Sequence, residues 1–396
     1  MSPHPGEPAT GTPGAGMPRV DFEQAPFLVI WETTQACALA CRHCRASARP
    51  DRDPLELTTE EGKRVIEETA GMGTPIVIFT GGDPVNRPDL LTLIRHAKEQ
   101  HLRAATIPAA TDCLTLDLVR RLKDAGLDQM ALSLDFPRAD LHDRFRGVQG
   151  AFDKTMAAVE WAHAVGLPLQ INTTVCGDTA PYLEEMAAFV EGLGIVFWEI
   201  FFLIPVGRGL MLKGLTAADC ERLFAVIHRV QQRRHFIVKV TEAPHYRRYV
   251  AQRERVAATT RGRPHARVAM PAVLTQSEGP GHTVGLAPRG VNAGNGFLFV
   301  SHRGEIFPSG FLPITAGNVR TDSLANVYRT SPLFADLRRP AGFKGRCGCC
   351  EYGEICGGSR SRAFALTGDP LETDPWCAYI PAGISQMSDA AVAGGV

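Results

Sequence analysis

The sequence has no net charge, no long apolar segment and no apolar stretch near its N-terminus. Its 42 Lys and Arg residues balance its 42 Asp and Glu residues, so its overall charge does not favour nucleic acid or anionic lipid as a partner. The most apolar run, GIVFWEIFFLIPVG at 194–207, is too short to cross a bilayer and contains Glu199. We therefore expect no membrane and no nucleic-acid partner. Residues 1–24 are rich in Pro and Gly and lack a signal-like core, which predicts a disordered leader and a cytoplasmic location.

The eleven cysteines are informative because disulfides are rare in the cytoplasm. Eight of them fall into two groups, at 37–44 and at 347–377. This clustering favours metal ligands. The other three, Cys113, Cys176 and Cys220, lie in helix-like or strand-like contexts, and we expect them to be ordinary core or surface thiols.

Strand-like and helix-like segments alternate between residues 27 and 241. Apolar stretches such as FLVIWE (27–32) and PIVIFT (75–80) are each followed by a helical pattern, the first with a capping box from Thr58 to Glu61. About six such units predict an α/β fold with a parallel sheet and right-handed crossovers. Periodicity alone does not decide between an open doubly wound sheet and a curved, barrel-like one.

The pattern changes after residue 243. A basic stretch is followed by one rich in Gly and Pro, and FLFVSHRGEIFPSG from 297 predicts a β-hairpin with its turn at Arg303 and Gly304. The segment NVRTDSLANVYRTSPLFADLRR predicts a helix, and a cysteine-rich segment follows. The expected organisation is a leader at 1–24, a β/α core at 25–243, a linker at 244–295, a small cysteine-rich α+β module at 296–385 and a frayed tail at 386–396.

The first cysteine group, Cys37, Cys41 and Cys44, follows the first predicted strand with the spacing C-x3-C-x2-C. Loops at the carboxyl ends of parallel strands build active sites in α/β folds. Three thiolates can hold three irons of a 4Fe–4S cluster and leave the fourth iron open to a small molecule. Three buried cysteines, or part of a zinc site, are the alternatives. The loop is also basic, which favours thiolate over thiol. Its basic residues are Arg42, His43 and Arg45.

The sequence CALACRHC after a first strand resembles the cysteine motif of the radical S-adenosylmethionine (radical SAM) superfamily. The resemblance implies a partial (β/α)6 TIM-like barrel in which SAM binds the open iron through its amino and carboxylate groups. It further implies that the reduced cluster cleaves SAM, and that the resulting 5′-deoxyadenosyl radical abstracts a hydrogen atom. An external one-electron donor such as a flavodoxin or ferredoxin is implied as a partner. His43 stands where the family often has an aromatic residue, and its flat ring can fill that position.

The resemblance also implies a set of SAM contacts. The family has a G-G-E-P-like turn after its second strand that binds the SAM amino group, and this chain has Gly81, Gly82, Asp83 and Pro84 there, with Asp for Glu. The glycines allow close backbone approach. The resemblance also implies contacts at the ends of later strands, each of which is a weaker signal when taken alone. The same residues also suit helix caps or buried hydrogen bonds. They are Ser133 and Asp135 near the ribose, Asn172 and Thr174 in the barrel interior, Ile204 and Val206 at the adenine, and Arg208 at the carboxylate.

The second cysteine group provides a full set of four thiolates, which suits zinc or a second 4Fe–4S cluster. Its predicted ligands are Cys347, Cys350, Cys356 and Cys377, with Cys349 as a spare thiol whose exchange with Cys347 stays open. The segment resembles the SPASM or shorter twitch extension of radical SAM enzymes. That extension places a cysteine after a G-x-I-x-P hairpin, where this chain has Ser309. The resemblance therefore implies one auxiliary 4Fe–4S cluster, fully ligated by protein and suited to electron transfer.

The motifs CRHC, FFLIPVGRG and ICGGSRSRAFALTGDPLETDPWC together look most like the tetrapyrrole-modifying branch, whose members act in the alternative haem and haem d1 pathways. In the former, two propionates of iron-coproporphyrin become vinyl groups through hydrogen abstraction, loss of carbon dioxide and removal of an electron. A basic stretch at 247–267 offers partners for carboxylates, or is a solvated helix and loop. Its arginines are Arg247, Arg248, Arg253, Arg255, Arg261, Arg263 and Arg267. Four histidines could include an axial ligand to a haem iron, or each could be an ordinary surface histidine. They are His245, His265, His282 and His302.

Two other functions fit parts of the pattern. A peptide-modifying radical SAM/SPASM maturase is the first alternative, although such enzymes usually carry an N-terminal winged-helix domain and residues 1–26 are too few for one. A non-enzymatic iron–sulfur electron carrier is the second, and the open-iron site and the large barrel argue against it. The sequence assigns no catalytic side chain.

Overall fold

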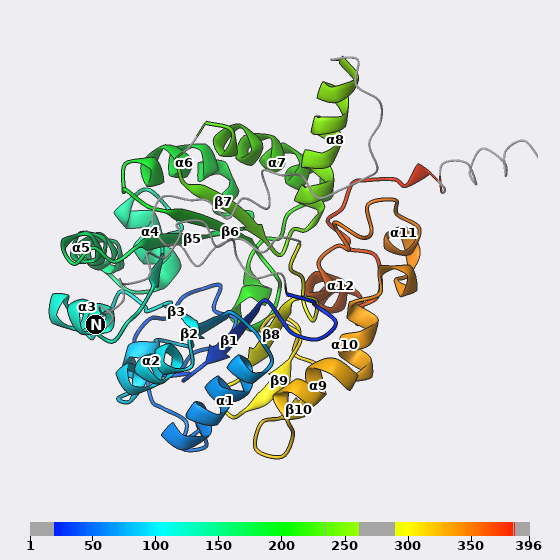
Figure 1. Ribbon diagram of the computed structural model, residues 1–396. Coiled ribbons are helices and arrows are strands. Elements are labelled where there is room, and N and C mark those ends of the chain that lie inside the picture. Colours follow the sequence, from blue (N-terminus) through cyan, green and yellow to red (C-terminus); the bar gives the residue numbers. More distant parts are fainter. Residues whose placement is uncertain (1–19, 234, 261–289, 383, 385–396) are drawn as a thin grey trace, which may run out of the picture.

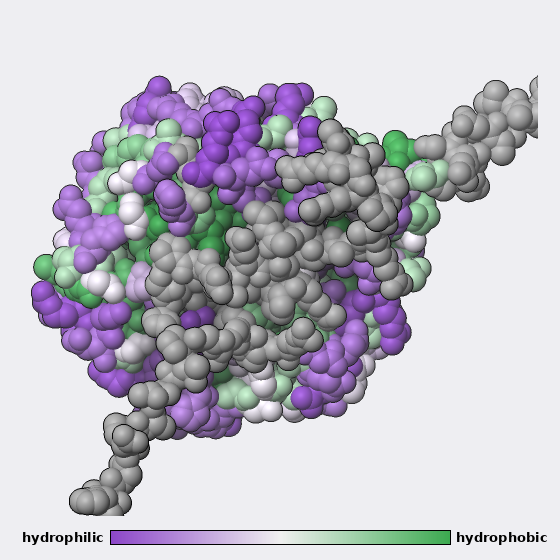
Figure 2. Space-filling view, turned by 45° about the horizontal axis from the view of Figure 1, so that its top comes forward, coloured by the Kyte–Doolittle hydropathy of each residue, from purple (hydrophilic) through white to green (hydrophobic). Residues whose placement is uncertain are grey.

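The computed structural model describes residues 20–233, 235–260, 290–382 and 384 (Figure 1). Most of the predicted leader, the Gly/Pro-rich part of the linker and the predicted frayed tail lie outside these residues. Among the described residues, no helix is long and apolar enough to span a membrane. On the face shown in Figure 2, hydrophobic residues are visible in a hollow near the middle, while hydrophilic residues dominate the rim.

The described strands form one sheet in the order β10-β9-β8-β1-β2-β3-β4-β5-β6-β7. Neighbours from β1 to β7 pair in parallel, and β8 pairs in parallel with β1. The strands are β1 (Leu28–Glu32), β2 (Ile76–Thr80), β3 (Arg103–Thr106), β4 (Gln129–Ser133), β5 (Leu169–Val175), β6 (Phe197–Phe202), β7 (Ile237–Thr241), β8 (Phe297–Val300), β9 (Glu305–Phe307) and β10 (Gly317–Asn318). The predicted α/β fold with a parallel, partial-barrel sheet is confirmed.

Figure 1 shows the first seven helices on the outside of the curved row of strands. They are α1 (Thr59–Gly71), α2 (Leu90–Glu99), α3 (Leu116–Asp124), α4 (Ala139–Arg146), α5 (Ala151–Ala164), α6 (Leu183–Glu191) and α7 (Ala217–Gln231). The later helices are α8 (His245–Thr260), α9 (Leu324–Thr330), α10 (Pro332–Leu337), α11 (Gly345–Gly348) and α12 (Arg360–Thr367). The predicted capping box of α1 is present, because Thr58 Oγ1 accepts from Glu61 N and Glu61 Oε2 accepts from Thr58 N. Large apolar side chains such as Trp31 and Trp198 are fully buried between sheet and helices.

Two details differ from the sequence-based expectation. The barrel has a seventh parallel strand, β7, which follows α7 and is short and only partly apolar. The predicted helix after the hairpin is two helices, because Ser331 is extended (ψ 127°) and Pro332 cannot donate the hydrogen bond that would continue α9.

The hairpin predicted near 297 is confirmed, with Gly304 at its turn in the left-handed region (φ 86°). Its first strand, β8, lies against β1 with Leu28 opposite Phe297. The segment predicted as a cysteine-rich module thus begins inside the barrel sheet. This pairing places the start of the cysteine-rich segment beside the first strand of the barrel.

Candidate active site between two groups of cysteines

The loop after β1 brings Cys37, Cys41 and Cys44 to one cavity, which we call the first cysteine cavity. It contains about 1320 Å3 of empty space, its open mouth included. Burial raises the pKa of Cys37 to about 12 and also raises the pKa of Cys41. In such a dry place the thiolate forms when a bound metal supplies the compensating charge. Within the described ranges, no three His, Cys, Asp or Glu side chains converge on one point as ligands of a single ion.

The predicted Gly-Gly turn lies directly against the segment that leads into the cysteine loop. Gly82 N donates to Thr34 O at 2.8 Å, and Asp83 N donates to Ala36 O at 2.7 Å. A Cβ atom on Gly82 would stand 2.5 Å from Gln35 O. Gly81 and Gly82 both line the first cysteine cavity. Glycine is therefore required at position 82 because the two backbone segments lie too close together to admit a side chain.

Asp83 is not directed at the cavity, which corrects the predicted contact. Its buried carboxylate accepts from Thr111 Oγ1 at 2.9 Å and from Ala109 N at 3.1 Å, and so braces the loop after β3. Burial raises the pKa of Asp83 to about 6. Pro84 begins a short 3-10 turn, Pro84–Asn86, and is also absent from the cavity wall.

Asp135 is likewise occupied by protein partners. Its buried carboxylate pairs with Arg146 and accepts from Thr174 N at 2.8 Å. Although burial opposes ionisation, the Arg146 guanidinium lowers the pKa of Asp135. Arg146 Nη1 in turn donates to Cys41 Sγ at 3.7 Å. Asp135 thus positions Arg146 and the β5 backbone instead of making the predicted ribose contact. Arg146 is the cation that contacts a thiol, and the sequence analysis did not single it out.

The other predicted contacts are mostly brought together. Ser133, Asn172, Thr174, Ile204 and Arg208 line the first cysteine cavity, whereas Val206 does not. The Nε and Nη2 atoms of Arg208 are buried and have no hydrogen-bond partner in the described part of the chain. A guanidinium fork in this state suits an anionic group entering the cavity. Three thiols beside an unpartnered fork are the donor set that an open-iron cluster and the carboxylate of SAM require.

The basic residues of the cysteine loop have other partners than predicted. Arg42 pairs with Asp178 at the surface, and Arg45 pairs with the buried Glu32. His43 stacks on Phe145 with ring centroids 4.5 Å apart, and burial lowers the pKa of His43 to about 3. The predicted flat ring is present and neutral. The expectation that these three residues supply free positive charge to the thiols is therefore corrected.

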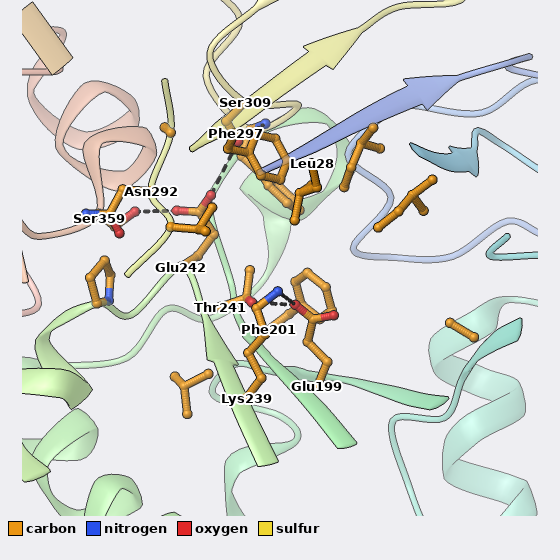
Figure 3. Close-up of a pocket in the computed structure, with 18 of the residues that line it drawn as sticks. Leu28, Glu199, Phe201, Lys239, Thr241, Glu242, Asn292, Phe297, Ser309 and Ser359 are labelled. Atoms are coloured by element: carbon orange, nitrogen blue, oxygen red, sulfur yellow. Dashed lines mark hydrogen bonds and ion pairs between the residues drawn. The ribbon is translucent and has the colours of Figure 1, made fainter. Parts of the chain in front are cut away.

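A second cavity, the central cavity, continues from the first into the barrel. It contains about 1150 Å3 of empty space, including its opening, and both cavities are lined by Ile30, Ile107, Phe201, Phe297 and Phe311. Figure 3 shows Leu28, Phe297 and Phe201 on its wall. The side formed by β1 to β3 is apolar, whereas the side formed by β5 to β7 and the tail is polar.

The polar side is an ordered network. Glu199 pairs with Lys239 at 2.6 Å and accepts from Thr241 Oγ1 at 2.6 Å (Figure 3). Glu242, directly after β7, has a left-handed backbone (φ 58°), which is uncommon for a residue other than glycine. Its carboxyl group accepts from the hydroxyls of Ser309, Ser359 and Ser361. Burial raises the pKa of Glu242. No local sequence signal pointed to this residue.

The tail cysteines form a third cavity, the tail cavity, with about 410 Å3 of empty space. It is lined by the four predicted ligands, Cys347, Cys350, Cys356 and Cys377. Cys349 is exposed and donates to Gly345 O at 3.6 Å, so the geometry favours Cys347 in the exchange that the sequence left open. Gly358 lines both the tail cavity and the central cavity. Ser309 lines the central cavity and not the tail cavity, so its hydroxyl stands apart from the four thiols.

Among the described arginines of the basic stretch, only Arg247 reaches the central cavity. Arg247 lines it, and burial lowers the pKa of Arg247 to about 10. The next arginines hold α8 in place: Arg248 pairs with Glu221, Arg253 lies over Tyr249, and Arg255 donates to the hydroxyl of Tyr352. Arg261, Arg263, Arg267, His265 and His282 lie outside the described residues.

The two described histidines of the predicted axial-ligand set do not face the central cavity. His245 is fully buried against Phe224, and His302 Nδ1 lies 2.8 Å from Glu32. An axial ligand is therefore unsupported at either position. Cys176 and Cys220 are buried and Cys113 is exposed, as expected for ordinary thiols.

Comparison with known proteins agrees with this geometry. Residues 31–190 match the profile of the Radical SAM superfamily. Among solved structures, Streptococcus suis SuiB bound to its precursor peptide SuiA superposes with a TM-score of 0.67 at 17% identity, over 90% of this chain and 76% of that one. At this identity the likeness shows the fold alone.

Two relatives are much more similar in sequence. The AdoMet-dependent heme synthase of Oleidesulfovibrio alaskensis is 38% identical over 369 residues, which cover 92% of this chain and 91% of that one. The AdoMet-dependent heme synthase of Methanosarcina barkeri is 37% identical over 363 residues, which cover 91% of this chain and 99% of that one. The chain belongs to the radical SAM superfamily. Within the superfamily, its family is that of the AdoMet-dependent heme synthases.

Proposed function

We propose that the chain converts propionate side chains of a haem-like tetrapyrrole into vinyl groups. One observation carries this proposal: the central cavity shares a wall of apolar residues with the cavity of the three cysteines and shares Gly358 with the cavity of the four cysteines. A substrate there can lose a hydrogen atom on one side and an electron on the other. The substrate class follows from the relatives and from the lining of the cavity.

The lining suits a flat ring that carries carboxylates. Aliphatic side chains of β1 to β3, such as Ile30 and Ile78, provide an apolar wall for the macrocycle. Lys239 and Arg247 line the same cavity and provide cations for carboxylates. Lys239 already pairs with Glu199, so a substrate carboxylate has to share or replace that partner. Among the described arginines of the basic stretch, Arg247 is the one that lines this cavity.

Each propionate loses one hydrogen atom from the carbon attached to the ring, then carbon dioxide and one electron, which leaves a vinyl group. When bound, SAM and the first 4Fe–4S cluster supply the radical that takes the hydrogen atom, and an auxiliary 4Fe–4S cluster at the tail takes the electron. Cys37, Cys41 and Cys44 would hold the first cluster, and the Arg208 fork would orient the SAM carboxylate. The remaining predicted contacts of Gly81, Gly82, Ser133, Asn172, Thr174 and Ile204 would surround SAM. A flavodoxin or ferredoxin is proposed as the electron donor.

The test is an anaerobic reaction with SAM, a reductant and iron-coproporphyrin, analysed by mass spectrometry. The expected product has lost carbon dioxide and two hydrogens at each of two side chains, and 5′-deoxyadenosine accumulates with it. Cys41→Ala should abolish both products. Cys356→Ala, shown to be folded with about half the iron, should still cleave SAM but fail to finish the tetrapyrrole. Modification of a candidate peptide with no change in the porphyrin would refute the proposal and favour a peptide maturase.

A further inference from the structure

Arg360 occupies the boundary between the central cavity and the tail cysteines. It begins α12 after the N-cap Ser359, which follows Gly357 and Gly358, and the left-handed backbones of these glycines (φ 68° and 64°) turn the chain beside the tail cavity. Its side chain is 1% exposed, and it lines the central cavity. The two glycines and the helix start therefore fix where its guanidinium lies.

The guanidinium group is held on several sides. Its Nη1 atom donates to Pro370 O at 3.0 Å and to Glu372 O at 2.8 Å, and its plane lies over the ring of Phe343, 4.4 Å from the centroid. Its Nη2 atom donates to Cys347 Sγ at 3.4 Å. A rigid guanidinium with one arm on a thiol is a preorganised hydrogen-bond donor to a predicted cluster ligand rather than a mobile surface charge.

The charge of Arg360 is not neutralised by an ion pair within the described ranges. Two residues further on, the equally buried Arg362 pairs with Asp374 at 3.2 Å. Arg146, the corresponding donor to Cys41 of the first group, pairs with Asp135. Arg360 instead bonds to main-chain carbonyls and to sulfur. Cys347 thus accepts from an arginine that has no ion-pair partner within the described ranges, whereas the arginine beside Cys41 is paired with a carboxylate.

We propose that Arg360 is a positioning residue that makes the tail cluster the better electron acceptor of the two. Reduction adds a negative charge to a thiolate-ligated cluster, so a nearby cation and an N–H···S hydrogen bond favour the reduced form and raise its reduction potential. The inference rests on the tail cluster of the proposed function. It adds that one side chain separates the substrate cavity from the acceptor and sets the direction in which the electron moves.

The experiment is a redox titration of the two-cluster protein, followed by electron paramagnetic resonance and carried out without substrate. Arg360→Gln should lower the midpoint potential of the tail cluster by at least about 59 mV, which is a tenfold change in the equilibrium constant of a one-electron couple. The midpoint of the first cluster should not change. Arg346→Gln is the matched control, because Arg346 also lines the tail cavity but donates to Tyr379 O instead of a thiol. The midpoint potential of the tail cluster should fall clearly less in Arg346→Gln than in Arg360→Gln.

An unchanged tail midpoint in Arg360→Gln, or equal shifts in both variants, would overturn the inference. If Arg360→Gln loses the tail iron, two milder variants decide in its place. Arg360→Lys keeps the charge without the fork, and Phe343→Leu removes the ring beneath it. Both should give intermediate falls in potential, and wild-type potentials in both would refute the role. Because the titration needs no substrate, its result can be interpreted even if the protein fails to modify a tetrapyrrole.

Discussion

Gly82→Ala should dismantle the first cysteine site through backbone contact alone. Gly82 is outside the left-handed region, so the substitution meets no torsional barrier there. The new Cβ atom would stand 2.5 Å from Gln35 O and 2.6 Å from Ala36 O, whereas ordinary contact begins at 3.4 Å. One of the two segments must move by about 1 Å, at a typical overpacking cost of about 1–3 kcal/mol. Because Ala36 precedes Cys37, the displacement shifts a cluster ligand.

The assay compares iron content and SAM cleavage after anaerobic reconstitution. Wild-type protein should bind about eight irons, as two 4Fe–4S clusters require. The variant should retain about four, all at the tail, and SAM cleavage should be abolished together with the first cluster. Gly71→Ala is the control, since a Cβ atom there meets nothing within 4 Å and Gly71 ends α1. Full iron and normal SAM cleavage in Gly82→Ala would show that the close approach does not position Cys37.

Three further changes test other parts of the site. Cys347→Ser should lose the tail iron while Cys349→Ser keeps it, and iron analysis showing the reverse would exchange the two assignments. Because burial raises the pKa of Glu242 above its ordinary value of 4.5, the native state favours its protonated form, and this stabilisation is lost as pH rises through the native pKa. Thermal denaturation should therefore show Glu242→Gln gaining stability relative to wild type as the pH rises above the ordinary glutamate pKa of 4.5, whereas parallel stability curves for the two proteins would contradict the raised pKa. Arg208→Leu should raise the Kd for SAM at least tenfold at unchanged iron content, because its fork has no other partner, and an unchanged Kd would remove Arg208 from the SAM site.

The features that could be predicted are those encoded by short-range spacing. The three cysteines, the Gly-Gly turn, the capping box of α1 and the hairpin with Gly304 each depend on residues close in sequence. The structure keeps all of them in place. Local spacing also predicted four ligands among the tail cysteines. It could not decide between Cys347 and Cys349, because only the folded structure shows which of the two thiols faces the cavity.

The features that were missed depend on contacts between distant segments. Arg146 reaches Cys41 from a helix 105 residues away, and nothing in its own neighbourhood marks it among many arginines. Asp83 and Asp135 were predicted to face SAM because of their places after strands. Each instead satisfies buried donors of a neighbouring loop or strand, since a buried carboxylate is costly without such partners.

Contacts among the described residues hold the segment that carries the tail cysteines against the barrel. β8 pairs with β1 along four residues, which brings Phe297 to the wall shared by the first two cavities. Glu242 accepts from Ser359, and its carbonyl accepts from Arg362 Nη2 at 2.6 Å. The strained backbone at Glu242 is thus held by bonds to the segment that carries the tail ligands.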